Sequence, residues 1–100
     1  MKGRKRILFE WDDDKNKYNK AVHKIDFETA ALVFADEHRI VLYDEKHSEY
    51  EDRYKTIGSI NGFVTVITVI YSVRSKSIRI ISARKADRKE KEQYYGKKRN

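Results

Sequence analysis

The sequence predicts an α+β fold, in which two helices near the N-terminus pack on a small, mainly antiparallel sheet and a third helix follows the sheet. Three observations lead to this prediction. Residues 62–84, GFVTVITVIYSVRSKSIRIISAR, hold the densest run of β-branched and aromatic residues and indicate two long strands joined by a tight polar turn. Two earlier stretches repeat apolar residues at helical spacing, and residues 85–100 are rich in helix formers. We therefore expect the strand pair to form the centre of one sheet.

Length and composition narrow the class of protein. A chain of 100 residues suits one domain with one core, so we expect a single domain over 1–100, with a basic extension at 1–6 and a helix and basic tail at 85–100. The absence of Cys excludes disulfides and cysteine-ligated zinc and is compatible with a reducing cytosol. The longest mainly apolar run, 63–73, is too short to span a bilayer. We expect a cytoplasmic protein with no membrane contact and no cofactor.

The net charge of +7 is concentrated at the two ends of the chain. Residues 1–8 carry a net +4, and residues 84–100 carry eight basic and three acidic side chains, whereas residues 9–83 carry a net −2. Basic ends suit a polyanion such as RNA or DNA, or an acidic protein partner. They equally suit a chain whose ends are only kept soluble by charge, so composition leaves both interpretations open.

The first predicted elements are a strand over residues 7–11 and a helix from about Asp13 to about Lys24. The strand alternates weakly and would lie beside the central strand pair. The acidic run 12–14 supplies a cap and negative charge for the first helical turn. A metal site is the less favoured alternative, because three consecutive acids point in different directions on a helix. We expect this helix to bury one apolar stripe, formed by Tyr18, Ala21, Val22 and Ile25.

A second helix is predicted from Phe27 to near Asp36, with Asp26 as its cap. Because Leu32 and Val33 add apolar residues beside its main stripe, we expect it to be buried on more than one side. Its main stripe consists of Phe27, Ala30, Ala31 and Phe34. The sequence therefore predicts a core element here rather than a recognition helix.

The sheet should then continue towards the central strand pair. A strand is predicted over residues 39–43, RIVLY, followed by a charged loop over 44–52 that contains His47. Another strand begins at Arg53 and ends at Asn61-Gly62, a strong signal for a two-residue hairpin. The last three strands are therefore expected to be hairpin neighbours.

Counting outward from the two turns predicts which side chains share a face. Arg53 should lie beside Ile70 and Ser72 beside Arg79, whereas Arg84 falls on the opposite face from Arg79, so that either the strand bends or Arg84 is structural. The face with fewer helices should carry a basic rim on an apolar floor, with Arg53, Lys55, Thr68, Ser72 and Arg79 among its residues. Such a face suits nucleic acid or a partner helix, and a one-residue slip would reverse the assignment.

The residues available for chemistry are acid–base and charged groups. The three histidines are scattered without the spacing of metal ligands, and neither a Gly-rich phosphate loop nor a serine nucleophile motif occurs. Acid–base and electrostatic groups suffice to cleave RNA, in which the 2′-hydroxyl attacks the neighbouring phosphate. They do not require that reaction, and spacing alone favours a noncatalytic binding module.

His47 is the best candidate for proton transfer, because it lies in a loop at the edge of the less covered face and histidine titrates near neutrality. Arg53 and Arg79 have the side chain that binds phosphate through paired hydrogen bonds. The alternatives are an exposed histidine without a role and arginines paired with nearby acids, namely Glu49, Glu51 or Asp52.

Several motifs together resemble the BrnT family of bacterial toxins. They are FEWD at 9–12, FETA at 27–30, VFAD at 33–36, His47-Ser48 and RIISAR at 79–84. The resemblance implies a RelE-like fold and a metal-independent ribonuclease that stops translation, and it leaves open whether the RNA is cut on the ribosome. It also implies a BrnA-like ribbon-helix-helix antitoxin, with DNA bound only through the toxin–antitoxin complex, which represses its own operon.

Carried over by position, the resemblance assigns proton transfer to His47 and phosphate contacts to the arginines. The implied catalytic residues are His47, Arg53, Arg79 and Arg84. The expected RNA-binding residues are Lys55 and Ser72, from the face predicted above, and Arg74. Two departures are Lys24, where the family commonly has glycine, and the basic extension at 1–6. A growth assay and the neighbouring reading frame would separate an active toxin from a binding module or from a degenerate toxin retained for operon repression.

Overall fold

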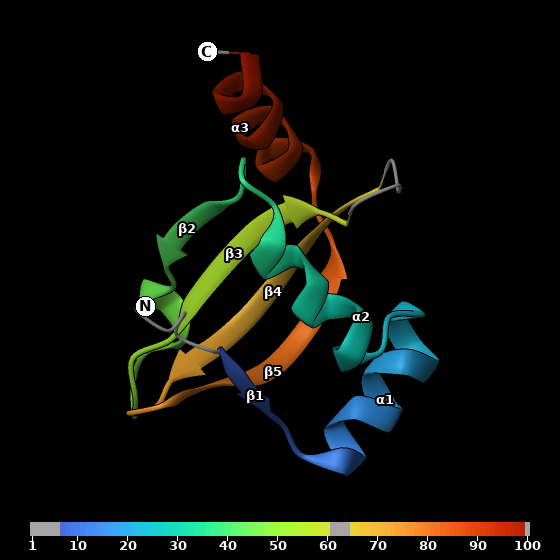
Figure 1. Cartoon of the computed structure of the whole chain (residues 1–100), viewed down its shortest axis with the longest axis vertical. Coiled ribbons are helices and arrows are strands. Elements are labelled where there is room, and N and C mark those ends of the chain that lie inside the picture. Colours follow the sequence, from blue (N-terminus) through green and yellow to red (C-terminus); the bar gives the residue numbers. More distant parts are fainter. Residues whose placement is uncertain (1–6, 61–64, 100) are drawn as a thin grey trace, which may run out of the picture.

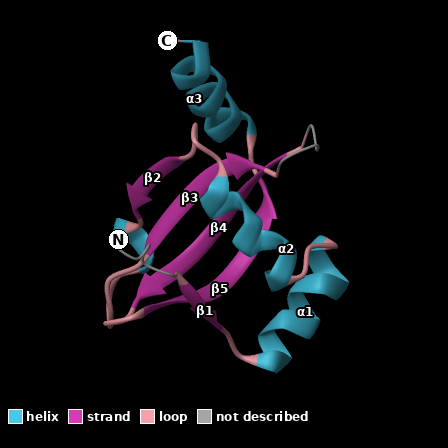
Figure 2. Cartoon of the chain, in the orientation of Figure 1, coloured by secondary structure: helices cyan, strands magenta, loops and turns pink. Residues whose placement is uncertain are grey.

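The computed structural model describes residues 7–60 and 65–99, and it consists of one five-stranded sheet with helices on one face and at one end (Figures 1 and 2). The strands follow the order β1-β5-β4-β3-β2 across the sheet. Their bounds are β1 Leu8–Glu10, β2 Ile40–Tyr43, β3 Tyr54–Ser59, β4 Val66–Val73 and β5 Ser77–Lys85. The α+β class is confirmed. The sheet is mixed, because β1 runs parallel to β5 while the other neighbouring pairs are antiparallel.

Three α-helices accompany the sheet, as predicted. They are α1 Asp13–His23, α2 Phe27–Ala31, which continues as a 3₁₀ turn over Leu32–Ala35, and α3 Arg88–Arg99. Helices α1 and α2 lie on one face, while α3 rises from the end of β5 and projects beyond the sheet (Figure 1). Among the described residues, no helix is long and apolar enough to cross a membrane. We call the face opposite α1 and α2 the open face.

The predicted helix caps are present. Asp12 accepts hydrogen bonds from the backbone N–H groups of Asp14 and Lys15 at 2.8 and 3.2 Å, and Asp26 accepts one from Thr29 at 2.7 Å. Helix α1 stops at Lys24, whose φ of 63° places it in the left-handed region that favours glycine. Lys24 therefore ends the helix in the conformation that glycine would adopt, at the cost of some backbone strain.

The predicted apolar stripe of α1 is wrong for Tyr18, Ala21 and Val22, which are exposed, whereas Ile25 packs against the main core. Tyr18 is 67% exposed and Val22 50% exposed, whereas the inward position is taken by Asn19, which is only 3% exposed. The Asn19 amide donates hydrogen bonds to the carbonyls of Ile25 and Ala83, both at 2.8 Å, and accepts one from the Ala83 N–H at 3.1 Å. Because the short β1 pairs only with residues 77–79, Asn19 supplies the hydrogen bonds that β5 lacks beyond them.

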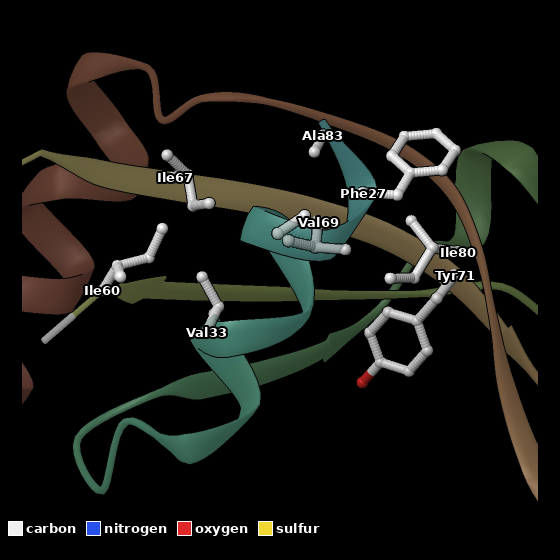
Figure 3. Packing of buried hydrophobic residues seen from close by; sticks show 9 residues of the cluster. Phe27, Val33, Ile60, Ile67, Val69, Tyr71, Ile80 and Ala83 are labelled. Carbon is white, nitrogen blue, oxygen red and sulfur yellow. The ribbon is translucent and has the colours of Figure 1, made fainter. Parts of the chain in front are cut away.

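The main core lies between α2 and the sheet (Figure 3). Phe27, Ala30 and Val33 are fully buried there, and the first two belong to the predicted stripe. Leu32 is 53% exposed, so the helix is not buried on several sides. The strands and the residue that follows β3 contribute a second group of buried side chains: Ile60, Ile67, Val69, Tyr71, Ile80 and Ala83. A smaller core on the open face joins the sheet to α3 through Ile57, Val66, Ala86 and Tyr94.

The register differs from the prediction in two places. Lys55, not Arg53, lies opposite Ile70, which is a shift of two residues and so keeps every side chain on its predicted face. The predicted Asn61-Gly62 turn falls outside the described residues.

The second difference lies between β4 and β5. Ser72 pairs with Arg79 as predicted, but an irregularity between Ile70 and Tyr71 leaves Ile81 without a partner and places Arg84 opposite Thr68. This bulge brings Arg84 onto the same face as Arg79, contrary to the prediction, because the extra residue reverses the alternation.

Candidate active site

A row of polar side chains crosses three strands on the open face, at the end of the sheet where the β4–β5 turn lies. Ser72 on β4 is paired with Arg79 on β5. The register that sets Tyr54 opposite Tyr71 places the preceding Arg53 beside Ser72 on the other side. Sequence reasoning grouped these three residues, and the structure brings them together.

The loop between β2 and β3 is folded back on itself by Ser48. The Ser48 hydroxyl donates a hydrogen bond to the Asp44 carbonyl at 2.7 Å and accepts one from the Arg53 N–H at 2.9 Å. The Asp44 N–H in turn donates to the Arg53 carbonyl at 2.8 Å. These bonds fix both ends of the loop, so the residue before Ser48, His47, is held at the edge of the open face.

His47 is oriented by a carboxylate. Its Nδ1 lies 3.0 Å from Oδ2 of Asp44, whose side chain is only 10% exposed. A carboxylate accepts hydrogen bonds, so Nδ1 carries the proton of this bond and Nε2 is left for a ligand. The His47 side chain is 56% exposed. This arrangement suits a histidine that exchanges a proton with a bound molecule.

His47 and Arg53 line the same hollow, of about 290 Å³. Its remaining walls come from the same loop, namely Lys46, Glu49, Tyr50 and Glu51. The hollow therefore joins a titratable ring, a guanidinium and two carboxylates. This is a composition that supports acid–base chemistry beside an anion.

The arginines of this region are held by glutamates. Glu51 lies 3.9 Å from Arg53 and 3.6 Å from Arg74, and Glu10 of β1 lies 2.9 Å from Arg79. Hydrogen bonds from Ser77 and Arg79 lower the pKa of Glu10. Both carboxylates are more than a third exposed, so water competes with these ion pairs and an incoming phosphate would compete too.

Two buried polar atoms in the row have no protein partner. They are Nε of Arg53 and the hydroxyl of Ser72, a residue that is 2% exposed. Both are hydrogen-bond donors, and a buried donor without a partner is destabilising by about 1–3 kcal/mol. Because both atoms are buried, a phosphate oxygen would reach them only after neighbouring side chains move, whereas the partly exposed guanidinium groups of Arg53 and Arg79 make the row a candidate phosphate site.

The other predicted residues, Lys55 and Arg84, are engaged by Glu90 of α3. Arg84 binds the Glu90 carboxylate through two hydrogen bonds, at 2.8 and 3.0 Å, and Lys55 binds it at 3.1 Å. Glu90 is only 3% exposed. Burial alone would raise its pKa, but hydrogen bonds from Arg84, the Asp87 N–H, Lys55 and Thr68 lower the pKa to about 2. These two cations therefore hold α3 on the open face.

Sequence reasoning missed the acidic members of this region as functional candidates. The spacing of Asp44 three residues before His47 was the available signal for an orienting carboxylate. Nothing in the spacing indicated that Glu10 or Glu90 would meet arginines, because these pairs join distant segments. Within the part of the chain that the structure describes, no three His, Asp or Glu side chains cluster as a metal site.

Two comparisons with known proteins match this chain. The family model described as ribonuclease toxin, BrnT, of type II toxin-antitoxin system matches residues 11–90. The crystal structure of the Brucella abortus ribonuclease toxin BrnT is similar at 28% sequence identity with a TM-score of 0.64, covering 83% of this chain and 100% of that chain. No curated protein matched the chain.

Proposed function

The chain belongs to the family of BrnT ribonuclease toxins of type II toxin–antitoxin systems, and from this membership we propose that it binds and cuts RNA on the open face, at the row of Arg53, Ser72 and Arg79. The chain is accordingly an endoribonuclease whose substrate is RNA and whose partner is an antitoxin. The observation that carries the placement is that Arg53 belongs both to this row and to the hollow that holds His47.

In the proposed reaction the RNA supplies its own nucleophile. The 2′-hydroxyl oxygen attacks the adjacent phosphorus, the bond from phosphorus to the 5′-oxygen breaks, and the products are a 2′,3′-cyclic phosphate and a 5′-hydroxyl. One proton leaves the 2′-hydroxyl and one is delivered to the departing 5′-oxygen. The protein therefore has to bind the phosphate, accept one proton and donate another.

The residues of the hollow and of the neighbouring strands fit these tasks. Glu51 is the proposed base, because an ionised carboxylate accepts a proton and this one lies between Arg53 and Arg74. His47 is the proposed acid, with Nδ1 held by Asp44 and Nε2 available to the leaving oxygen. Arg53, Arg79 and Ser72 are the proposed donors to the phosphate oxygens, and Arg74 is the proposed contact to a neighbouring phosphate.

Arg84 and Lys55 also belong to the proposed site, but in a different role. Their bonds to Glu90 support holding α3 against the sheet, whereas a direct catalytic role for Arg84 or an RNA contact for Lys55 would require Glu90 to release them. We therefore assign them to positioning. Direct contact with RNA by either residue stays a prediction.

The finer features of the family complete the proposal. Four features follow from the resemblance: a BrnA-like ribbon-helix-helix antitoxin, RNA cleavage associated with ribosomes, a cytoplasmic location and a RelE-like classification of the fold. The order of elements, two helices followed by an antiparallel strand set, supports the RelE-like classification. Operon repression through the antitoxin complex would bring the protein to DNA.

The test is cleavage of RNA by purified protein in a buffer that contains a chelator, with analysis of the product ends. We expect cyclic phosphate and 5′-hydroxyl ends. His47→Asn and Glu51→Gln should each lower kcat about 100-fold. His38→Asn, on an exposed histidine outside the hollow, is the matched control and should cleave normally. Intact RNA together with normal growth on expression would contradict the proposal.

A further inference from the structure

A second surface lies along α3, away from the hollow at His47. Two hollows of about 390 Å³ each share Lys91 and Tyr95 as walls. The first also includes Lys85, at the end of β5, and the second includes Gly96, where an added Cβ would meet nothing within 4 Å. Because the same two residues line both hollows, we treat them as one surface and call it the α3 groove.

The exposed aromatic ring of the α3 groove packs against a buried aromatic ring. Tyr95 is 38% exposed, and its ring lies 5.4 Å from the ring of Tyr94, which is 1% exposed. The Tyr94 hydroxyl donates a hydrogen bond to Asp36 at 2.6 Å. The exposed ring is thus attached to the rest of the fold through its buried neighbour, and such a ring can stack with a base at little entropic cost.

The charged residues that line the α3 groove fall into two groups: Arg88 and Glu92 pair with each other at 3.5 Å, whereas the two lysines have no acidic partner among the described residues. Within the described part of the chain, neither Lys85 nor Lys91 forms an ion pair, whereas Arg53 and Arg79 are both held by glutamates. Unpaired lysines keep their attraction for an approaching polyanion. Two lysines beside an exposed aromatic ring have the composition of a site for single-stranded nucleic acid.

We propose that the α3 groove binds a single-stranded part of the RNA substrate outside the cleavage site, with a base stacked on Tyr95 and phosphates against Lys85 and Lys91. This inference rests on the proposed function of the open face. Strand β5 connects the two places, since Arg79 and Lys85 are six positions apart and each position adds about 3.3 Å, or roughly 20 Å in all. Lys85 lies opposite Ile67 and so on the other face from Arg79, and the RNA would therefore cross the end of the sheet beside α3. A strand of several nucleotides covers that distance, and only an unpaired base can stack on a protein ring.

Binding is measured with fluorescent 2′-O-methyl RNA, which lacks the attacking hydroxyl and cannot be cut. Tyr95→Ala should weaken a strand of about 16 nucleotides by roughly 5- to 150-fold, and Tyr95→Phe should restore binding. The double variant Lys85→Ala, Lys91→Ala should reduce the slope of log affinity against log salt concentration by about 1.4. A strand of about 4 nucleotides, too short to reach both sites, should bind all variants alike.

The matched control is the triple variant Lys17→Ala, Tyr18→Ala and Lys20→Ala, which removes one exposed tyrosine and two exposed lysines from α1. It should bind both strands normally. Equal loss in this control, or unchanged binding of the long strand by the α3 variants, would overturn the inference. Thermal melting of each variant shows whether a loss reflects unfolding, and Tyr95→Phe keeps the test valid if Tyr95→Ala unfolds.

The inference and the proposed function fail separately. If the unmutated chain cuts no RNA, the function is wrong whatever the binding result. If it cuts long RNA and the Tyr95→Ala chain does so with unchanged KM, the α3 groove is not a substrate site. Loss of neutralisation by a co-expressed antitoxin, with RNA binding intact, would assign the groove to the antitoxin and also overturn the inference.

Discussion

Asn19 shows how one polar residue can join two elements. Its side-chain amide makes three hydrogen bonds to the backbone, of which two are with Ala83 on β5. We predict that Asn19→Ala lowers the free energy of unfolding by about 3 kcal/mol, because it leaves buried backbone groups of β5 without partners. Chemical denaturation measures the loss. Lys17→Ala on the exposed side of the same helix should change stability by less than about 0.5 kcal/mol, and an equal loss in both would refute this explanation.

Gly58 shows that the fold also depends on a position where a side chain is absent. A Cβ at Gly58 would lie 2.9 Å from Cγ1 of Val33 and 3.1 Å from Oδ2 of Asp36. We predict that Gly58→Ala destabilises the fold by about 1–3 kcal/mol, since the 3₁₀ turn after α2 must move away from β3. The midpoint of urea unfolding reports the effect. An unchanged midpoint would show that this packing adjusts freely.

At the scale of elements, the attachment of α3 depends on Glu90. Its buried carboxylate joins Arg84 on β5 and Lys55 on β3. We predict that Glu90→Gln destabilises the fold by about 3–5 kcal/mol, because two partly buried cations lose their counter-ion. Denaturation of the variant tests this, and the triple variant Glu90→Gln, Arg84→Met and Lys55→Met should recover part of the loss. No recovery would mean that the cations are not the cause.

The elements themselves were largely predictable, and their contacts were not. Helix caps and strand composition are local, so Asp12, Asp26 and the β-branched run of β4 predicted elements that the structure confirms. The inward face of α1 failed because Asn19 finds backbone partners on β5, which no local pattern reveals. The face of Arg84 failed for a similar reason, since one unpaired residue in β5 reverses the alternation.

At the scale of the whole molecule, stability should depend on acid pH. Hydrogen bonds lower the pKa values of Asp26, Asp36 and Glu90, the last to about 2. Groups with lowered pKa stabilise the fold above their unfolded values, near pH 4, and this stabilisation is lost as pH falls through their folded values. We predict that the free energy of unfolding declines from about pH 4.5 towards pH 2.

Denaturation curves at a series of pH values test this decline. The Glu90→Gln chain should show a shallower decline, because it lacks the carboxylate with the largest shift. A flat profile between pH 4.5 and pH 2 would contradict the pKa values that the hydrogen bonds imply.

The face on which the candidate site lies was predictable, because side chains alternate between the two faces along a strand. Arg53, Ser72 and Arg79 were grouped correctly although the register was two residues off, because an even shift leaves faces unchanged. The carboxylates that surround them were not predictable as a set, since Glu10 and Glu51 reach the arginines from separate segments. The roles of these residues stay predictions until cleavage is measured.

The smaller core on the open face has a consequence for synthesis of the chain. Tyr94 closes that core and Glu90 neutralises two cations of the sheet, so both contributions arrive after every strand has been made. A nascent chain still held at residue 85 exposes Ile57 and Val66 and carries uncompensated charge on Lys55 and Arg84. A premature stop codon before position 90 should therefore yield a less stable, protease-sensitive product.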